Sequence, residues 1–388
     1  MFKRTMIAAS LAVAALASAQ SMAAVVGGGA TLPEKLYGTT TGTGILASSI
    51  PGFNAYIGVG SGDGKKAFFG NDSTKLKLAA GINVDYAGSD SIVSATELAA
   101  YNADTVKGSA AFGPLIQVPA AATSVTVPYH INGKTSLKLT SVQLANIFAG
   151  VTKNWNEVLF DGVAGPNLPI KVVYRTETSG TTEILTTHLK AVSGTLLPAA
   201  SNSFATAVGF NPAVNPPAGT NYIGVVGSQG VATAVADANN NGAIGYVSPD
   251  YAQFNDASAV ASINGALPTE VNVQVTLDTV APPALGTNDA KDPLKWVPTF
   301  ANPTAGYPIV GYTNLVFSQC YKDTTDTARI RNFLNRHYTG VNNAAVSSHS
   351  FIPLSATWQK AVHDNFYATT STLRLGDTNV CNGIGRPQ

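Results

Sequence analysis

The sequence has little charge of either sign and no long apolar run beyond its N-terminal segment. Only 12% of its 388 residues are Asp, Glu, Lys or Arg, and the formal net charge is +1. A nearly neutral protein does not attract nucleic acid or anionic lipid over long distances. We therefore expect no nucleic-acid partner and, beyond that N-terminal segment, no membrane span.

Cysteine is almost absent, with only Cys320 and Cys381 near the C-terminus. In an oxidising compartment such a pair forms a disulfide more often than a metal site, so we predict a disulfide that fastens the C-terminus. No two histidines have the His-x-x-x-His spacing of a zinc-binding helix. We predict no metal site and no cofactor. The five histidines are His130, His188, His337, His349 and His363.

The N-terminus has the pattern of a secretory signal peptide. Lys3 and Arg4 precede a short apolar stretch, and small residues follow it up to Ala24. A basic start, an apolar core and a small-residue cleavage site are typical of a segment that is removed on export. We assign residues 1–24 to the signal peptide and expect the mature protein to be periplasmic or secreted.

Strand-like and helix-like patterns alternate along the chain. Apolar and polar residues alternate over 82–87 and 124–129, as in strands with one buried face. Segments 94–97 and 140–143 have the spacing of a capping box at the start of a helix. Such alternation predicts an α/β architecture whose ligand sites lie in strand-to-helix loops.

The later segments continue this plan. Residues 170–174 alternate as a strand, and the apolar residues of 184–192 share one helical face, so that helix begins near residues 179–181. Residues 242–247 have the pattern of a buried strand. We predict amphipathic helices at 329–334 and 358–366.

The segment 27–34, GGGATLPE, is a candidate anion site. Its three glycines permit a close backbone approach, and Pro33 suits the first turn of a helix. Backbone N–H groups at such a helix start, beside the Thr31 hydroxyl, favour an anion. The alternative is a plain connection between a strand and a helix, because glycine-rich turns are common there.

The segment 172–185, VVYRTETSGTTEIL, places Arg175 shortly before a run of hydroxyl residues with one glycine. A guanidinium can hold a tetrahedral oxyanion through two parallel hydrogen bonds, and the hydroxyls and backbone N–H groups of the run can complete the grip. The alternative is an ion pair between Arg175 and Glu177 or Glu183. The candidate ligands here are Arg175, Ser179, Gly180 and Thr181.

The segment 88–91, GSDS, places Asp90 at the end of a predicted strand. A carboxylate is useful in an anion site only when the anion keeps a proton that the carboxylate can accept. Phosphate near neutral pH keeps one and sulfate does not, so Asp90 would discriminate against sulfate. The alternative is an ordinary turn aspartate. The glycine-rich segment 58–64 offers Ser61 with the same ambiguity.

Seven stretches in order along the chain carry a family resemblance: GGGATLPEKLY (27–37), IGVGSGDGKKAF (57–68), YAGSDS (86–91), LTSVQLANIFAGVTKNW (139–155), VYRTETSGTTE (173–183), AIGYVSP (243–249) and YPIVGYT (307–313). They resemble the phosphate-binding proteins of ABC phosphate importers, and most closely their DING-protein relatives. The resemblance implies a two-lobed venus-flytrap fold, in which each lobe is a mixed sheet flanked by helices and the ligand lies in the cleft between them. Crossings near Val127 and Val247 would divide the chain into lobe 1 (25–127 and 248–388) and lobe 2 (128–247).

The resemblance also implies a function and a ligand shell. It implies a monomer that binds inorganic phosphate without catalysing a reaction and passes it to an ABC phosphate permease. The residues that it implies around the phosphate are the Thr31 hydroxyl, the Leu32 N–H, Ser61, Asp90, Arg175, Ser179, the Gly180 N–H and Thr181.

Two departures from the DING pattern leave the role of the protein open. Residues 24–26, Ala-Val-Val, stand in place of the Asp-Ile-Asn that gives DING proteins their name, and one disulfide can form where relatives often carry two. Phosphatase activity has been ascribed to some DING relatives, so a secreted phosphatase or phosphodiesterase is an alternative. We favour a receptor, because no general base stands at a recognisable spacing from Ser179 or Thr181. A secreted phosphate-scavenging or adhesion protein without a transporter is a third interpretation.

Overall fold

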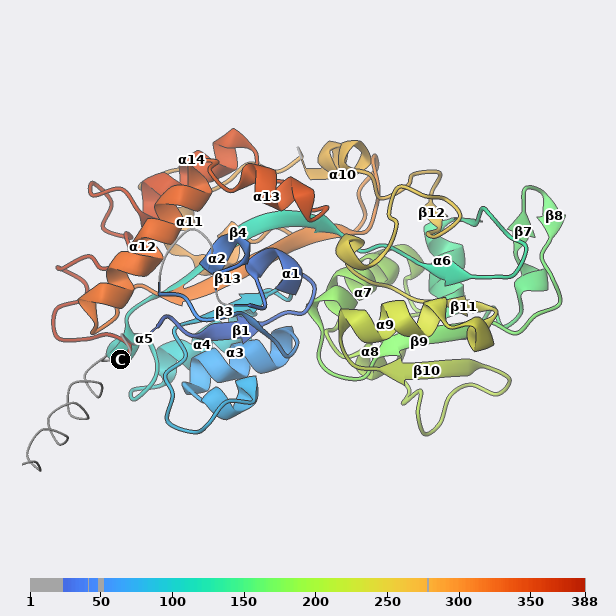
Figure 1. Cartoon of the computed structure of the whole chain (residues 1–388), viewed down its shortest axis with the longest axis horizontal. Helices are drawn as coiled ribbons and strands as arrows, with labels where there is room; N and C mark the ends of the chain where they lie inside the picture. The colour runs from blue at the N-terminus through green and yellow to red at the C-terminus, as the bar shows by residue number, and fades with distance from the viewer. Residues whose placement is uncertain (1–23, 41, 48–51, 278, 388) are drawn as a thin grey trace, which may run out of the picture.

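The computed structural model describes residues 24–40, 42–47, 52–277 and 279–387. The predicted signal peptide, apart from Ala24, lies outside these residues. The described chain forms two lobes that lie side by side along its longest axis (Figure 1). Each lobe has its own β-sheet with helices around it, which confirms the predicted α/β architecture.

The sheet of the first lobe has five strands in the order β2-β1-β3-β13-β4. Its first three strands are parallel, and β13 is antiparallel to both of its neighbours, so the sheet is mixed. Figure 1 shows that β4 and β13 are long and extend toward the second lobe. The strands are β1 (Gly27–Gly29), β2 (Ile57–Gly58), β3 (Tyr86–Ser89), β4 (Leu115–Ser124) and β13 (Val310–Ser318).

The three glycines expected in a loop form the buried strand β1. A Cβ on Gly27 would lie 2.4 Å from the Tyr86 ring, and one on Gly29 would lie 2.1 Å from the Gly88 carbonyl oxygen. Larger residues would therefore collide with the neighbouring strand β3. These glycines allow β1 to pass close to β3, and they bring the chain to Thr31 at the edge of the sheet.

The sheet of the second lobe has four strands in the order β10-β9-β11-β5. Strand β9 is parallel to β10 and β11, and β5 is antiparallel to β11. Two shorter pairs lie beside this sheet, namely β6 with β12 and β7 with β8. The strands are β5 (Tyr129–His130), β6 (Lys138–Leu139), β7 (Leu159–Phe160), β8 (Val163–Ala164), β9 (Lys171–Arg175), β10 (Asn221–Val225), β11 (Ala243–Ile244) and β12 (Ser262–Ile263).

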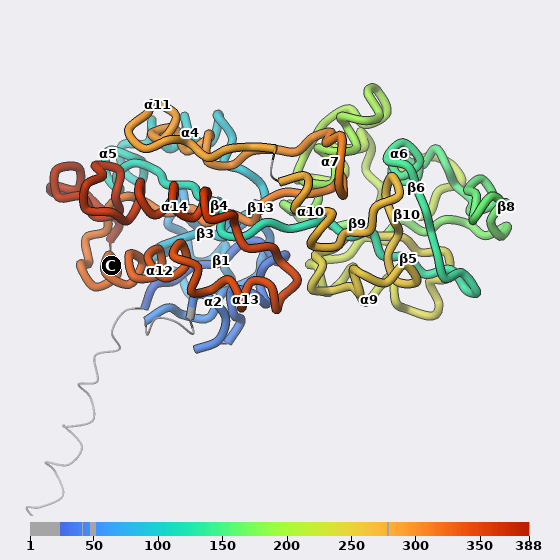
Figure 2. The backbone as a smooth tube through the Cα atoms, turned by 90° about the horizontal axis from the view of Figure 1, so that it is seen from above, coloured from blue at the N-terminus to red at the C-terminus, as the bar shows by residue number. Residues whose placement is uncertain are grey.

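Helices flank both sheets. In the first lobe α3 packs on β1 and β3, and in the second lobe α9 packs on β9 and β10. Figure 2 shows the C-terminal helices gathered over the first lobe. The α-helices are α1 (Glu34–Tyr37), α2 (Gly44–Ala47), α3 (Ser61–Gly70), α4 (Ala95–Ala103), α5 (Ser109–Phe112), α6 (Ser141–Phe148), α7 (Gly180–Ser193), α8 (Phe204–Val208), α9 (Gly227–Ala236), α10 (Glu270–Leu277), α11 (Asn288–Lys291), α12 (Thr324–Tyr338), α13 (Asn343–Ser348) and α14 (Ala356–Phe366). Short 3-10 turns are η1 (Ser73–Leu76), η2 (Trp155–Glu157), η3 (Ala238–Asn240), η4 (Pro249–Tyr251) and η5 (Pro293–Trp296).

Local sequence signals predicted helix starts better than strand limits. Both capping boxes are present, with Ser94 and Thr140 at the N-caps of α4 and α6. The strand predicted over 82–87 begins only at Tyr86, because the Val84 N–H donates to the Asn71 side chain instead of a neighbouring strand. The strand predicted over 124–129 is split between the end of β4 and the start of β5.

The chain passes between the lobes at residues 125–128. There Thr126 pairs with Val247, the two residues being hydrogen-bonded in both directions. Residues 262–263 of β12 pair with β6 and so lie beside the second sheet. The division at residues 127 and 247 remains a prediction, and the β6–β12 pairing indicates that part of the segment after residue 247 belongs with lobe 2.

The C-terminus is fastened to the first lobe by a disulfide and a buried arginine. Cys320 and Cys381 form the predicted disulfide. The Arg386 guanidinium donates to the carbonyl oxygens of Val84 and Phe68, both at 2.6 Å, and to the Ser318 hydroxyl at 2.8 Å. Among the described helices, none combines the length and the apolar character needed to cross a membrane.

We expect Arg386→Ala to lower the free energy of unfolding by roughly 3 to 5 kcal/mol, because two buried carbonyl oxygens lose their donors. Urea unfolding monitored by circular dichroism measures this change. The control is Lys291→Ala at an exposed position, for which we expect a change within about 0.5 kcal/mol. Equal stability of the two variants would show that Arg386 does not hold the C-terminus.

Candidate functional site

The predicted ligand residues come from both lobes and meet at the ends of strands and the starts of helices. Thr31 follows β1, Asp90 follows β3, and Arg175 ends β9. Ser61 is the first residue of α3, and Ser179 is the N-cap of α7. Parallel strands present their carboxyl ends at one edge of a sheet, where ligand sites of α/β proteins commonly lie. The structure thus gathers residues that are distant in sequence at one place between the lobes.

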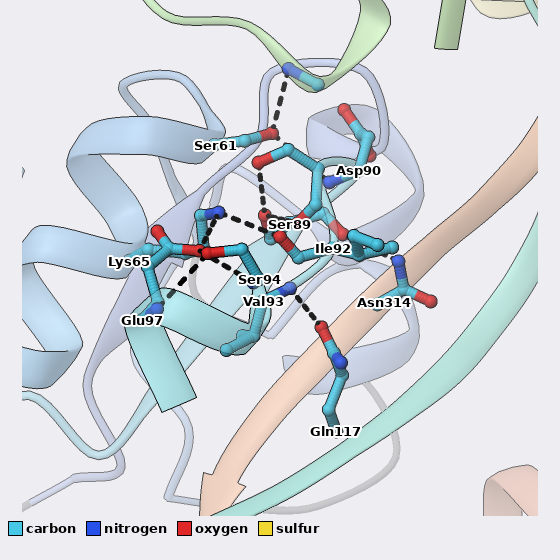
Figure 3. Close-up of polar contacts among 12 residues, drawn as sticks. Ser61, Lys65, Ser89, Asp90, Ile92, Val93, Ser94, Glu97, Gln117 and Asn314 are labelled. Atoms are coloured by element: carbon cyan, nitrogen blue, oxygen red, sulfur yellow. Dashed lines mark hydrogen bonds and ion pairs between the residues drawn. The ribbon is translucent and has the colours of Figure 1, made fainter. Parts of the chain in front are cut away.

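Ser61 links the two lobes directly. Its hydroxyl oxygen accepts the Asp90 N–H and the Gly180 N–H, each at 3.1 Å (Figure 3). Since both bonds use the oxygen as an acceptor, the Ser61 proton remains available to donate to a third group. Ser61 is fully buried, so that third group would be shielded from solvent.

Glycine is required where the lobes approach each other. A Cβ on Gly180 would lie 2.4 Å from both the Asp90 Cβ and the Ser91 nitrogen. On the facing side, a Cβ on Gly62 would lie 1.9 Å from the Thr178 hydroxyl. These distances show that the N-terminus of α7 lies against the loop after β3, with no room for a side chain between them.

Arg175 is buried and contacts both lobes. Its Nη2 donates to the Thr31 hydroxyl at 3.0 Å across the lobes, and its Nε donates to Glu177 Oε1 at 2.5 Å. The ion pair with Glu177 that the sequence left open is therefore present, together with the contact across the lobes. Among the ion pairs of the described residues, none joins Arg175 to Glu183.

Several polar atoms in this region are buried without a hydrogen-bond partner. They include Asp90 Oδ1 and the hydroxyl of Thr181, and each of these residues is less than 5% exposed. Burial raises the pKa of Asp90 to about 7, although the Thr313 hydroxyl and Arg175 oppose this shift. Buried polar groups are normally paired, so these atoms indicate a missing partner that can both donate and accept hydrogen bonds.

The other predicted residues are placed as follows. The Ser179 hydroxyl accepts the Thr182 N–H at 3.3 Å, which leaves its own proton available. Thr31 is 7% exposed and Leu32 is fully buried in the hydrophobic core beside it. The role of these residues toward a ligand remains a prediction, and their positions agree with a shared site.

Three further residues belong to this region and were not singled out from the sequence. The Tyr246 hydroxyl accepts the Arg175 N–H at 3.0 Å and lies 2.8 Å from the Thr182 hydroxyl. The Ser228 hydroxyl lies 3.3 Å from that of Thr31, and the Ser248 hydroxyl is buried without a partner. Tyr246 and Ser248 lie in the stretch AIGYVSP, which was the only signal available for them. In the described chain no three His, Cys, Asp or Glu residues are grouped so that they could hold a metal ion.

Comparison with known proteins identifies relatives over the whole chain. The family model described as PBP superfamily domain matches residues 14–335. A protein of Pseudomonas aeruginosa strain PAO1 named alkaline phosphatase L is 48% identical over 100% of both chains. A phosphate-binding protein from an unknown prokaryotic organism is 41% identical over 93% of this chain and 99% of its own. The structure of the high-affinity periplasmic phosphate-binding protein PfluDING with bound phosphate matches with a TM-score of 0.82 and 40% identity, over 94% of this chain and 99% of that one.

The raised pKa of Asp90 predicts how stability depends on pH. The pKa rises from 3.8 to about 7 on folding, so the folded state binds the proton more tightly. The contribution of Asp90 therefore favours folding at low pH and is lost as the pH rises through about 7. In buffer free of phosphate and sulfate, we expect Asp90→Asn to be more stable than the wild type at pH 8, by about 2 to 4 kcal/mol.

Urea unfolding at pH 4 and pH 8 measures this difference, which should nearly vanish at pH 4. Asp63→Asn at a partly exposed position on α3 is the matched control, with no expected gain at pH 8. A loss of stability at pH 8 for Asp90→Asn would mean that the Asp90 Oδ1 atom also has a partner in the free protein.

Proposed function

This chain belongs to the PBP superfamily, and we propose that it binds inorganic phosphate between its two lobes without catalysing a reaction. The observation that carries this proposal is the unpartnered oxygen of Asp90 in a buried site lined mainly by hydrogen-bond donors. A ligand for this site has to accept several hydrogen bonds and donate one. Protonated phosphate meets both requirements, whereas sulfate at neutral pH has no proton to donate.

The proposed phosphate shell contains the eight residues predicted from the sequence. The free protons of Ser61 and Ser179, the unpartnered Thr181 hydroxyl and the Arg175 guanidinium are the donors that the geometry supports most directly. The Leu32 N–H and the Thr31 hydroxyl complete the shell, with Asp90 as the acceptor. The Gly180 N–H, which donates to Ser61 in this structure, would be shared between Ser61 and the phosphate. Charge-assisted hydrogen bonds in a dry site are stronger than the same bonds in water, which favours tight binding.

Binding requires the lobes to open and close, because the proposed shell is buried on both sides. We place the hinge in the two segments that pair through Thr126 and Val247. Gly62 and Gly180 then allow the loops of the two lobes to come together when the lobes close. Closure around a ligand by a hinge of a few residues is a common motion of two-lobed binding proteins.

We also propose the cellular role and location that the family resemblance implied. The protein would be exported by its signal peptide to the periplasm or the medium, and as a monomer it would deliver phosphate to an ABC permease. Tight capture by a carrier that can diffuse supports uptake at low phosphate concentration. A secreted scavenger without a transporter would use the same site.

Phosphatase activity remains the second candidate function, because a relative with 48% identity is named alkaline phosphatase L. The hydroxyls of Ser179 and Thr181 are the conceivable nucleophiles. Among the described hydrogen bonds, none joins either hydroxyl to a histidine or a carboxylate that could serve as a general base. We therefore place binding before hydrolysis.

We expect the mature protein to bind phosphate and to prefer it strongly over sulfate at pH 8 in calorimetric titrations. The double variant Arg175→Gln/Glu177→Gln removes the guanidinium without leaving a buried unpaired carboxylate. It should weaken phosphate binding at least about 100-fold, because two charge-assisted hydrogen bonds are lost. Lys190→Ala on the far part of α7 is the control and should bind normally. Absence of phosphate binding by the wild type would overturn the proposed function.

We expect that no activity toward a chromogenic phosphomonoester co-purifies with this protein through successive columns. The measurement compares the wild type with Ser179→Ala and Thr181→Val, each checked for folding by circular dichroism. Turnover that persists in the pure wild type and disappears in one of these variants would place the enzyme first.

A further inference from the structure

A β-bulge in β4 lies beside the part of β13 that is next to the loop carrying Asp90. Strand β13 runs between β3 and β4, and its register with β4 shifts between Thr313 and Asn314, where Ala120 of β4 has no partner in the ladder. Bulges are often found next to functional sites. Because the extra residue belongs to β4, the ladder of β13 with β3 stays regular and determines which side chains of β13 face the end of β3.

The register of β13 with β3 places Thr313 across from Asp90. Asn314 pairs with Ser89 in the antiparallel ladder, so the preceding residue Thr313 lies opposite the following residue Asp90. The Asn314 amide donates to the Ser89 carbonyl oxygen at 3.1 Å, which fixes this register (Figure 3). From this position the Thr313 hydroxyl acts on the Asp90 carboxyl as a hydrogen-bond donor and lowers its pKa.

A buried tyrosine supports Thr313 from the other side. The Tyr37 hydroxyl on α1 lies 3.3 Å from the Thr313 hydroxyl, and both side chains are fully buried. Burial raises the pKa of Tyr37 well above its usual value, so its proton stays in place and can be donated. Either hydroxyl of this pair can be the donor. Because Thr313 has only one proton, Tyr37 is the donor whenever Thr313 donates to Asp90, and Asp90 Oδ1 remains without a partner.

We propose that Thr313, placed by the register of β13 with β3 and supported by Tyr37, is a positioning residue that keeps Asp90 an acceptor and thereby sets the preference for phosphate over sulfate. The inference rests on the proposed phosphate function and adds residues that do not touch the ligand. A hydrogen bond donated to a carboxylate favours its ionised form. Without it, Asp90 stays protonated at higher pH and becomes a donor, which suits sulfate.

The charged and titratable groups around Asp90 act in opposite directions. Arg175 on β9 lowers the pKa of Asp90, and Glu183 on α7 raises it. The hydroxyls of Tyr37 and Tyr56 have raised pKa values because they are buried, so they remain neutral. Thr313 is the neighbour that can be changed without altering any charge, which makes it the clearest position for a test.

The test measures the affinities for phosphate and sulfate by calorimetry from pH 5 to pH 8.5. We expect sulfate binding by the wild type to strengthen as the pH falls and Asp90 becomes protonated. In Thr313→Val this onset should move to higher pH by about one unit, and phosphate affinity at pH 7 should fall about ten-fold. Thr313→Ser keeps the hydroxyl and should behave as the wild type, and Tyr37→Phe should shift the onset in the same direction by less.

Thr123→Val on β4 is the matched control, since Thr123 is a fully buried threonine whose hydroxyl donates to the Ser124 carbonyl oxygen. It should leave both pH profiles unchanged. A folded Thr313→Val with the selectivity of the wild type at every pH would overturn the proposal, as would the same shift in the control.

A measurement without ligand separates this inference from the proposed function. The effect of Thr313→Val on the pH dependence of unfolding is measured twice, once in the wild-type protein and once in the Asp90→Asn variant. We expect Thr313→Val to change that dependence only when Asp90 is present. The same change in both backgrounds would overturn the contact between Thr313 and Asp90. If the wild type bound no phosphate, the proposed function would fail. This comparison would still show whether Thr313 acts on Asp90.

Discussion

When a buried carboxyl group has one oxygen without a partner, that oxygen needs a ligand that donates a hydrogen bond to it. Asp90 imposes this constraint on the site, and the raised pKa of its carboxyl reflects the cost of burying a charge without that ligand. The surrounding groups fit the constraint, because the protons of Ser61 and Ser179 are not used by their own contacts. The free protein thus gives up stability at Asp90, and the proposed ligand would restore it.

Arg175 contributes less net charge than a lone arginine would, because Glu177 neutralises it within the same site. The Glu177 carboxylate also accepts the Gly227 N–H at 2.9 Å, so it is held in place at the start of α9. An anion in this site would be bound mainly by oriented neutral donors rather than by excess positive charge. Oriented donors distinguish ligands by the positions of their protons, whereas net charge attracts every anion.

The sequence predicted the parts of the site that depend on local order in the chain. Helix starts at Ser94 and Thr140 follow from capping-box spacing, and the start near Ser179 follows from the apolar face of residues 184–192; the structure has each of them. Tyr246 and Thr313 reach the site through strand register, which a single sequence does not specify. Strand limits near residue 82 were wrong because a side chain, Asn71, satisfies the backbone there. Long-range pairing therefore accounts for most of what the sequence could not predict.

The C-terminal fastening and the site are connected through one strand. Ser318 ends β13 and accepts the Arg386 guanidinium, and Cys320, bonded to Cys381, follows two residues later. A one-residue slip of a strand turns every side chain to the opposite face of the sheet. Anchoring the end of β13 to Arg386 and to the disulfide opposes such a slip and so keeps Thr313 facing Asp90. The covalent and buried polar contacts of the last residues thereby preserve the geometry of a site at the other end of that strand.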